Sequence, residues 1–129
     1  MKATKKAQYA LRAMILLAKK REVCSLRLIA KAENISFDYL EKIFSRLEKG
    51  GLVNSKRGAT GGYTLSRVPE EITLRDIFNA VEEEIAIVEC IKEKCPRDSS
   101  CRATSAWREV NKRIEESLSS ITLDDLIKR

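Results

Sequence analysis

The sequence predicts a mostly α-helical protein built on a winged helix-turn-helix domain, with a long helix near its C-terminal end. Three observations support this prediction. Two short helices with clear N-cap residues follow one another closely, a glycine-rich hairpin comes directly after them, and the front of the chain is more basic than the back. The 129 residues are 43% hydrophobic and only 5% aromatic, which suits one small helical domain better than a many-stranded sheet.

The first helix is expected at residues 5–20, with Thr4 as its N-cap. Basic residues resume at positions 19–21 and no signal-peptide cleavage pattern follows, so we interpret the segment as an amphipathic helix that stays in the protein. No stretch approaches the roughly 18 apolar residues of a membrane span. We therefore expect a cytoplasmic protein with no membrane partner, whose cysteines are reduced thiols, metal ligands or redox sensors.

The helix-turn-helix is expected over residues 25–50. Ser25 caps its first helix and Ser36 caps its second, while Asn34 between them tolerates the left-handed conformation of a tight turn. The second helix ends at Gly50-Gly51. Its core-facing side is predicted to consist of apolar residues at helical spacing, namely Leu40, Ile43, Phe44 and Leu47.

A hairpin and a fourth helix follow. The strands are expected at residues 52–56 and 63–66, joined by the glycine-rich turn Arg57–Gly62, which forms the wing. Thr73 caps the fourth helix. The segment from Cys90 to Cys101 is polar and lacks periodicity, so we expect a loop there.

A long helix is predicted from about Arg102, with a short last helix opened by Thr122 and Asp125. The apolar residues of the long helix recur every three or four positions, which is typical of a helix-packing seam. Plain core packing is one explanation, but we favour an antiparallel dimerisation helix, because the chain offers little else to pack against. The predicted organisation is residues 1–80 for DNA binding, 81–101 for the cysteine loop and 102–129 for dimerisation, with helix 5–20 also contacting the partner.

The order of these elements and their charge predict binding to double-stranded DNA. Residues 1–62 carry a net charge of +9 and residues 63–129 a net charge of −3. A helix fits the major groove and a basic wing reaches the neighbouring backbone, although a solvated basic surface would show the same charge. The predicted DNA contacts are Ser36, Tyr39, Glu41, Lys42, Arg46, Lys56 and Arg57.

One of these residues, Glu41, is unusual on a DNA-facing helix. A carboxylate repels phosphate, but it can accept a hydrogen bond from cytosine N4. Our hypothesis is that Glu41 determines sequence specificity.

Three cysteines are candidate metal ligands. Cys90, Cys95 and Cys101 form a C-x4-C-x5-C pattern, and thiolates are the natural ligands of iron–sulfur clusters and zinc. Zinc is less favoured because the chain has no His and the loop has no fourth Cys. A disulfide that leaves one thiol over, or three free thiols, are the alternatives. Cys24 stands apart and is expected to be a small buried hydrophobic residue.

The chain resembles the IscR-like iron–sulfur regulators of the winged-helix Rrf-type family of bacterial repressors. The segments that carry this resemblance are KKAQYALRAM, ISFDYLEKIFSRLEKGGLVNSKRGATGGYTLSR, the three-Cys loop, and CRATSAWREVNKRI with SITLDDLI. The resemblance implies a homodimer that binds an operator in response to an iron–sulfur cluster, 2Fe–2S rather than 4Fe–4S. By position, the three cysteines match the cluster ligands, and Ser36, Glu41 and Arg57 match DNA-contacting residues.

The fourth cluster ligand departs from the family pattern. IscR-like proteins carry a His three residues after the third Cys, and Thr104 occupies that position here. Other members use an acidic residue of the partner subunit, which corresponds to Gln8. The fourth site is therefore open between Thr104, Gln8, a carboxylate such as Glu93 or Asp98, and an external thiol or water.

The sequence thus predicts a cluster-responsive transcriptional regulator and not an enzyme. It has no His and no nucleophile–base pair, and Gly58–Gly62 precedes a strand and lacks the ending of a phosphate-binding loop. Two alternatives share the same fold. One is a repressor that senses redox state through thiols without a cluster, and the other is a repressor controlled by a protein partner.

Overall fold

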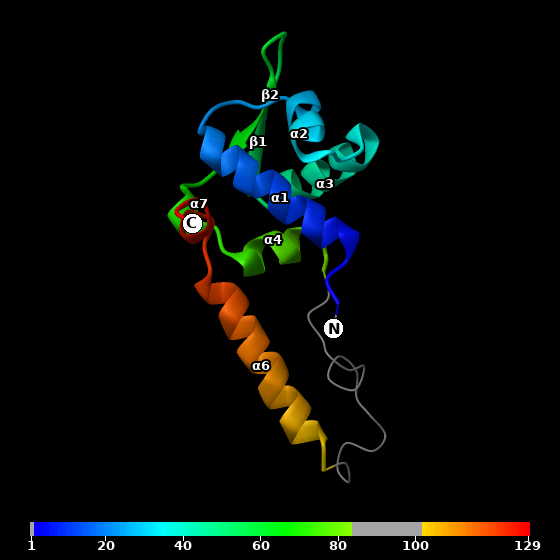
Figure 1. The fold of residues 1–129 in the computed structure, drawn as a ribbon, viewed down its shortest axis with the longest axis vertical. Helices are drawn as coiled ribbons and strands as arrows, with labels where there is room; N and C mark the ends of the chain where they lie inside the picture. Colours follow the sequence, from blue (N-terminus) through cyan, green and yellow to red (C-terminus); the bar gives the residue numbers. More distant parts are fainter. Residues whose placement is uncertain (1, 84–101) are drawn as a thin grey trace.

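The computed structural model describes residues 2–83 and 102–129, which form a helical body with a protruding hairpin and a projecting helix (Figure 1). The predicted fold class, a mostly helical winged helix-turn-helix, is confirmed. The elements in chain order are α1 Lys5–Lys20, α2 Leu26–Glu33, α3 Phe37–Lys49, β1 Val53–Lys56, β2 Gly62–Leu65, the 3-10 helix η1 Pro69–Glu71, α4 Leu74–Ala80, α6 Thr104–Ser120 and α7 Leu123–Ile127.

Short polar side chains start the helices of the DNA-binding unit. Thr4, Ser25 and Ser36 each accept a hydrogen bond from the backbone N–H three residues further on, as their positions in the sequence predicted. Asn34, between α2 and α3, has a φ of 55°, which is the left-handed conformation expected of the turn. Local sequence therefore accounts for the starts of these helices and for the turn between α2 and α3.

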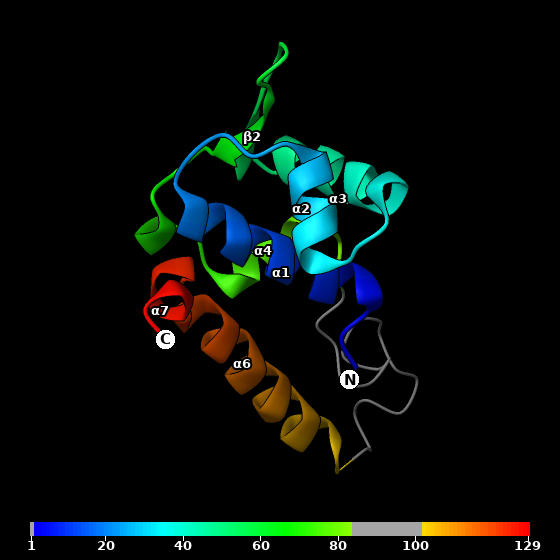
Figure 2. The same ribbon diagram turned by 45° about the horizontal axis from the view of Figure 1, so that its top comes forward.

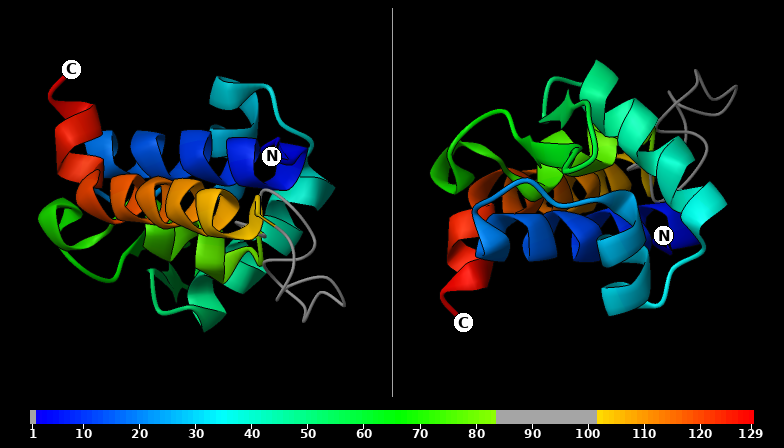
Figure 3. Two further views of the ribbon diagram at one scale, coloured as in Figure 1. Left: turned by 90° about the horizontal axis from the view of Figure 1, so that it is seen from below. Right: turned by 90° about the horizontal axis from the view of Figure 1, so that it is seen from above.

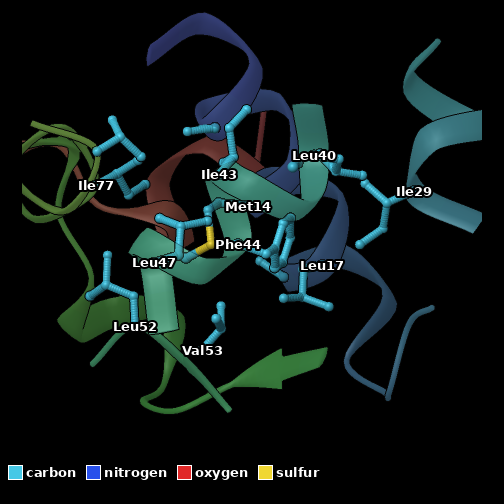
Figure 4. Packing of buried hydrophobic residues seen from close by; sticks show 14 of the residues in the cluster. Met14, Leu17, Ile29, Leu40, Ile43, Phe44, Leu47, Leu52, Val53 and Ile77 are labelled. Carbon is cyan, nitrogen blue, oxygen red and sulfur yellow. The ribbon is translucent and has the colours of Figure 1, made fainter. Parts of the chain in front are cut away.

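The core lies where α1 crosses α3. Met14 and Leu17 of α1 pack with Phe44 and Leu47 of α3, and all four side chains are fully buried (Figure 4). α1 also contacts α2, α4 and α7, so it is the scaffold on which the other helices are assembled. Burial of Phe44 and the apolar residues around it contributes about 1.5–3 kcal/mol per side chain.

The wing is a two-stranded antiparallel hairpin, paired from Val53–Leu65 to Lys56–Gly62. Its strands differ by one residue from the predicted bounds, since β1 begins at Val53 and β2 at Gly62. Tyr63 and Cys24 exchange two backbone hydrogen bonds of 2.8 and 2.9 Å, so the segment before α2 pairs with β2. A Cβ on Gly62 would lie 2.2 Å from the carbonyl oxygen of Cys24, which explains why only glycine fits there.

Within the described residues, the C-terminal elements contact the body around the junction of α6 and α7. The Leu74 N–H donates to the Ile121 carbonyl (3.0 Å) and the Leu123 N–H donates to the Ile72 carbonyl (2.9 Å), which fixes the junction of α6 and α7 beside the start of α4. α7 packs near the C-terminal end of α1, opposite the N-terminus (Figure 3). The other end of α6 extends away from the body (Figures 1 and 2).

No helix within residues 2–83 or 102–129 is long and apolar enough to cross a membrane.

Candidate nucleic-acid interface

The α3 helix presents a polar face on the side opposite its buried stripe. Leu40, Ile43, Phe44 and Leu47 are buried, as the helical spacing predicted. The exposed residues of the helix include Asp38, Tyr39, Glu41, Lys42, Ser45 and Lys49. Ser36 is exposed at the N-terminal end, where free backbone N–H groups suit a phosphate. The amphipathic pattern therefore determines which side chains of α3 can reach DNA.

The wing adds basic charge on the same side of the molecule. Lys56 and Arg57 are exposed, and the tip protrudes beyond the body (Figure 1). In both Figure 1 and Figure 2, the wing and the α2–α3 pair lie on one side, while α6 leaves from the other. A helix and a basic hairpin arranged in this way can occupy a major groove and the adjacent backbone at the same time.

Tyr39, a predicted DNA contact, also packs against α1. Its ring meets the Tyr9 ring edge-on, with 5.6 Å between centroids and an interplanar angle of 86°. Arg12 lies over the other ring of this pair, 5.6 Å from the Tyr9 centroid, and forms a 3.2 Å ion pair with Glu33. The N-terminal half of α1 is thereby joined both to the end of α2 and to the start of α3.

Arg46 is placed differently from the other predicted DNA contacts. Its Nη1 atom lies 3.4 Å from the Val81 carbonyl oxygen and 3.5 Å from Glu82 Oε2, just after α4. One nitrogen of the guanidinium is therefore bound within the protein, while 42% of the side chain is exposed. A phosphate contact by Arg46 remains a prediction.

The predicted cluster ligands are only partly within the described residues. Cys90, Cys95 and Cys101 lie outside them, and the remaining described residues contain no group of three His, Cys, Asp or Glu side chains that could hold a metal. Thr104 is 3% exposed, and its Oγ1 atom has no hydrogen-bond partner in the described part of the chain. Gln8 is exposed on α1, and its Nε2 atom donates to the Ala3 carbonyl at 3.0 Å.

Cys24 is buried, as the sequence predicted, and it is not part of a metal site among the described residues. Burial, and to a smaller extent the Glu22 carboxylate, raise the pKa of its thiol above the usual value. Little thiolate forms at neutral pH, so Cys24 is a poor metal ligand and a poor redox sensor.

Glu83 is a buried acidic residue that the sequence analysis did not identify. It is 8% exposed, and its carboxylate accepts hydrogen bonds from the backbone N–H of Thr4 (3.2 Å) and from the Thr4 hydroxyl. It is one of three consecutive glutamates, and nothing in that run distinguishes the buried one. The only signal was Thr4 itself, which the sequence marked as the start of α1.

Comparison with known proteins identifies the family. The profile of the Rrf2 family, described as an iron-dependent transcriptional regulator, matches residues 3–129. The chain belongs to the Rrf2 family. It is 38% identical to the HTH-type transcriptional regulator IscR of Xenorhabdus nematophila over 131 residues, which is 99% of this chain and 80% of that protein.

Two solved structures support the same assignment. The chain is similar to CymR (YrzC), the global cysteine regulator of B. subtilis, with a TM-score of 0.82, 38% identity, and coverage of 99% of this chain and 97% of the other. It is also similar to T. potens IscR, with a TM-score of 0.80, 37% identity, and coverage of 99% and 87%. As a member of this family, the protein is a DNA-binding transcriptional regulator and not an enzyme.

Glu41→Ala is predicted to relax operator specificity. Removing the carboxylate should remove the penalty against sites without a suitable cytosine, which corresponds to about 1–3 kcal/mol of discrimination at that base pair. The measurement is binding to a panel of operators with single base-pair changes. Glu71→Ala, an exposed acidic residue of η1, is the charge-matched control. Equal discrimination by Glu41→Ala and the wild type would contradict the hypothesis.

Proposed function

We propose that this regulator binds its operator in response to a 2Fe–2S cluster held by Cys90, Cys95 and Cys101. The three-thiol pattern and the description of the family as iron-dependent support the proposal. The observation that carries it is Thr104, whose buried hydroxyl has no partner among the described residues and lies three positions beyond Cys101. An orphaned buried hydroxyl costs about 1–3 kcal/mol, and a ligand at that point would remove the penalty.

The residues that are present fit such a group. Three thiolates supply most of the donor set of an iron–sulfur cluster. Thr104 is the stronger candidate for the fourth position within one chain, because it is already buried and unpaired. Gln8 is exposed on α1 and would act from a partner subunit. When bound, the cluster supplies a redox-sensitive cross-link between the three cysteines.

The role of the protein in this scheme is to convert ligation into a change in DNA binding. Cys101 stands three residues before the start of α6, and residues 84–101 connect α4 to that helix in the sequence. Holding the cysteines at one point restrains how α6 is joined to the DNA-binding unit. Losing that restraint shifts the population between forms that bind DNA well and poorly.

We also propose that the working form is a homodimer paired through α6. Trp107 and Val110 are 39% and 42% exposed on a helix that projects from the body, and Ile114 continues the same stripe. A second copy would cover these side chains and bring two α3 helices to a two-fold operator. Since its relatives are bacterial transcriptional regulators that act on DNA, we place the dimer in the bacterial cytoplasm.

The Trp107→Lys/Val110→Lys double variant is predicted to be monomeric. Two charges on the apolar stripe would have to be desolvated in the dimer, which is prohibitive without partners. Sedimentation velocity of the wild type and the variant measures the change. Ser105→Lys, exposed on the opposite side of α6, is the control and should remain dimeric. A dimeric double variant would show that another surface mediates association.

A second candidate function is thiol sensing without a cluster. The similar structure of CymR is described as that of a global cysteine regulator, so the fold also suits a protein of that description. In this case Cys90, Cys95 and Cys101 would act through oxidation or through small sulfur compounds. Control by a protein partner is the remaining alternative, and it requires no metal.

Iron content separates these functions. Protein purified without oxygen is predicted to contain about two iron and two acid-labile sulfide per chain and to show a visible charge-transfer band. A Thr104→His variant should lose the cluster more slowly in air than the wild type, because an imidazole is a better iron ligand than a hydroxyl. Colourless protein that resists reconstitution would contradict the cluster and favour thiol sensing. Equal loss rates would remove Thr104 from the fourth position.

A further inference from the structure

The three residues Val81–Glu83, which follow α4, are held from two sides. Val81 is buried, and Glu82 has a left-handed φ of 59°, an uncommon conformation for a residue with a side chain. The Glu83 N–H donates to the Phe78 carbonyl at 2.8 Å, which closes the turn. This turn is the last described part of the chain before residues 84–101.

The first attachment is direct and comes from α3. Arg46 reaches both the Val81 carbonyl oxygen (3.4 Å) and the Glu82 carboxylate (3.5 Å). The side chain of Glu82 is 75% exposed, so the ion pair alone contributes little to stability. The contact matters for geometry, because it directs the guanidinium of a DNA-facing helix toward the turn.

The second attachment runs through α1. The buried Glu83 carboxylate receives the Thr4 N–H and hydroxyl, and the Thr4 hydroxyl in turn accepts from the Ala7 N–H at 3.2 Å. A carboxylate at a helix N-terminus is stabilised by the free N–H groups and the helix dipole. Glu83 thus fixes the N-terminal end of α1 to the turn.

From α1 the connection continues to the start of α3. One turn or two beyond Thr4, Tyr9 packs on Tyr39, and Arg12 pairs with Glu33 at the end of α2. The Arg12 guanidinium also donates to the Glu33 carbonyl oxygen. Both ends of α3 are therefore connected to Val81–Glu83. The C-terminal end is connected through Arg46 and the N-terminal end through α1.

We propose that Arg46 and Glu83 are positioning residues that set the pose of α3 from the turn Val81–Glu83, and that Arg46 does not contact phosphate. The Arg46 Nη1 atom already lies within hydrogen-bonding distance of the turn, at 3.4 Å from the Val81 carbonyl oxygen and 3.5 Å from the Glu82 carboxylate. Lys42 on the same helix is exposed and makes no hydrogen bond or ion pair within the described ranges. Residues 84–101, which contain the predicted cluster ligands, follow this turn directly in the sequence. If the proposed function holds, the turn is the point through which cluster binding would alter the pose of α3, and this part of the inference rests on the proposed function.

The salt dependence of DNA binding distinguishes positioning from phosphate contact. Each phosphate contact contributes about −0.9 to the slope of log K against log salt concentration, whereas a residue that acts through another leaves the slope unchanged. Arg46→Met keeps the aliphatic stem and removes the guanidinium. Lys42→Met is the matched control on the exposed face. Affinity is measured for the operator and for unrelated duplex DNA over a range of salt concentrations.

Arg46→Met is expected to lower operator affinity about tenfold, to leave binding to unrelated DNA within about twofold of the wild type, and to keep the salt slope. Lys42→Met should reduce the slope by about 0.9 and weaken binding to both DNAs. If Arg46→Met instead loses slope as Lys42→Met does, or keeps the wild-type ratio of operator to unrelated DNA affinity, the proposal is overturned.

Two further variants test the turn itself, and their melting temperatures are compared with the wild type to show that each is folded. Glu82→Gln should weaken operator binding several-fold although it removes a negative charge, because the link to Arg46 is loosened. Glu71→Gln is the charge control and should bind at least as well as the wild type.

Glu83→Ala should weaken operator binding as well, while Thr4→Ser keeps the hydroxyl and should behave as the wild type. Operator binding that is unchanged in both Glu82→Gln and Glu83→Ala would overturn the proposal.

The measurements are made on anaerobically purified protein and again after removal of iron. The salt slopes of the variants and the wild type are compared separately for the iron-loaded and the iron-free protein. The test of Arg46 is therefore valid whichever of the two forms binds the operator. Equal affinity of the two wild-type forms would contradict the proposed cluster response and leave the test of Arg46 intact. Failure of the inference and failure of the proposed function are thereby separate outcomes.

Discussion

The packing of α1 across α3 is the contact on which the rest of the structure depends. Phe44 and Leu47 bury one side of α3 against Met14 and Leu17, and this leaves the opposite side of the same helix exposed. A rotation of α3 by a quarter turn would expose apolar residues and bury charged ones, at a cost of several kcal/mol. The core therefore fixes which side chains can meet DNA, as well as holding the fold together.

The wing depends on the same scaffold through a backbone contact. Tyr63 is hydrogen-bonded to Cys24 in the segment between α1 and α2, and Gly62 leaves room for that approach. A two-stranded hairpin is marginal alone, and it is supported both by this pairing and by direct contacts with α3, where Tyr63 packs on Phe44 and the Ser55 N–H donates to Glu48 at 3.2 Å. These contacts hold the wing beside α3, as simultaneous contact with groove and backbone on DNA requires.

Local chemistry made much of the fold predictable. The caps at Thr4, Ser25 and Ser36, the turn at Asn34 and the apolar stripe of α3 were all evident in the sequence, because each depends on residues within one or two helical turns. The burial of Cys24 was expected, but its pairing with Tyr63 was not. The short strands were placed to within one residue, since a hairpin also depends on near neighbours.

The contacts that depend on distant residues were not predictable in this way. Arg46 was predicted to suit phosphate as a basic residue of α3, and nothing in the local sequence indicated its contacts with positions 81 and 82. The contact between Glu83 and Thr4 was not predictable either, because the two residues lie 79 positions apart in the sequence. Both contacts meet at the exit of α4. Sequence patterns therefore predicted which side of α3 is buried, and they missed the contacts that join α3 and α1 to the turn after α4.

Regulation of operator binding by a cluster is tested most directly by measuring the affinity of the protein for one operator. The cluster-loaded protein and the same preparation after iron removal are compared at the same salt concentration. The proposed cluster function predicts a coupling of the usual size, about 5- to 150-fold, between the two forms. Equal affinities in protein that demonstrably carries and then loses its iron would contradict regulation by a cluster.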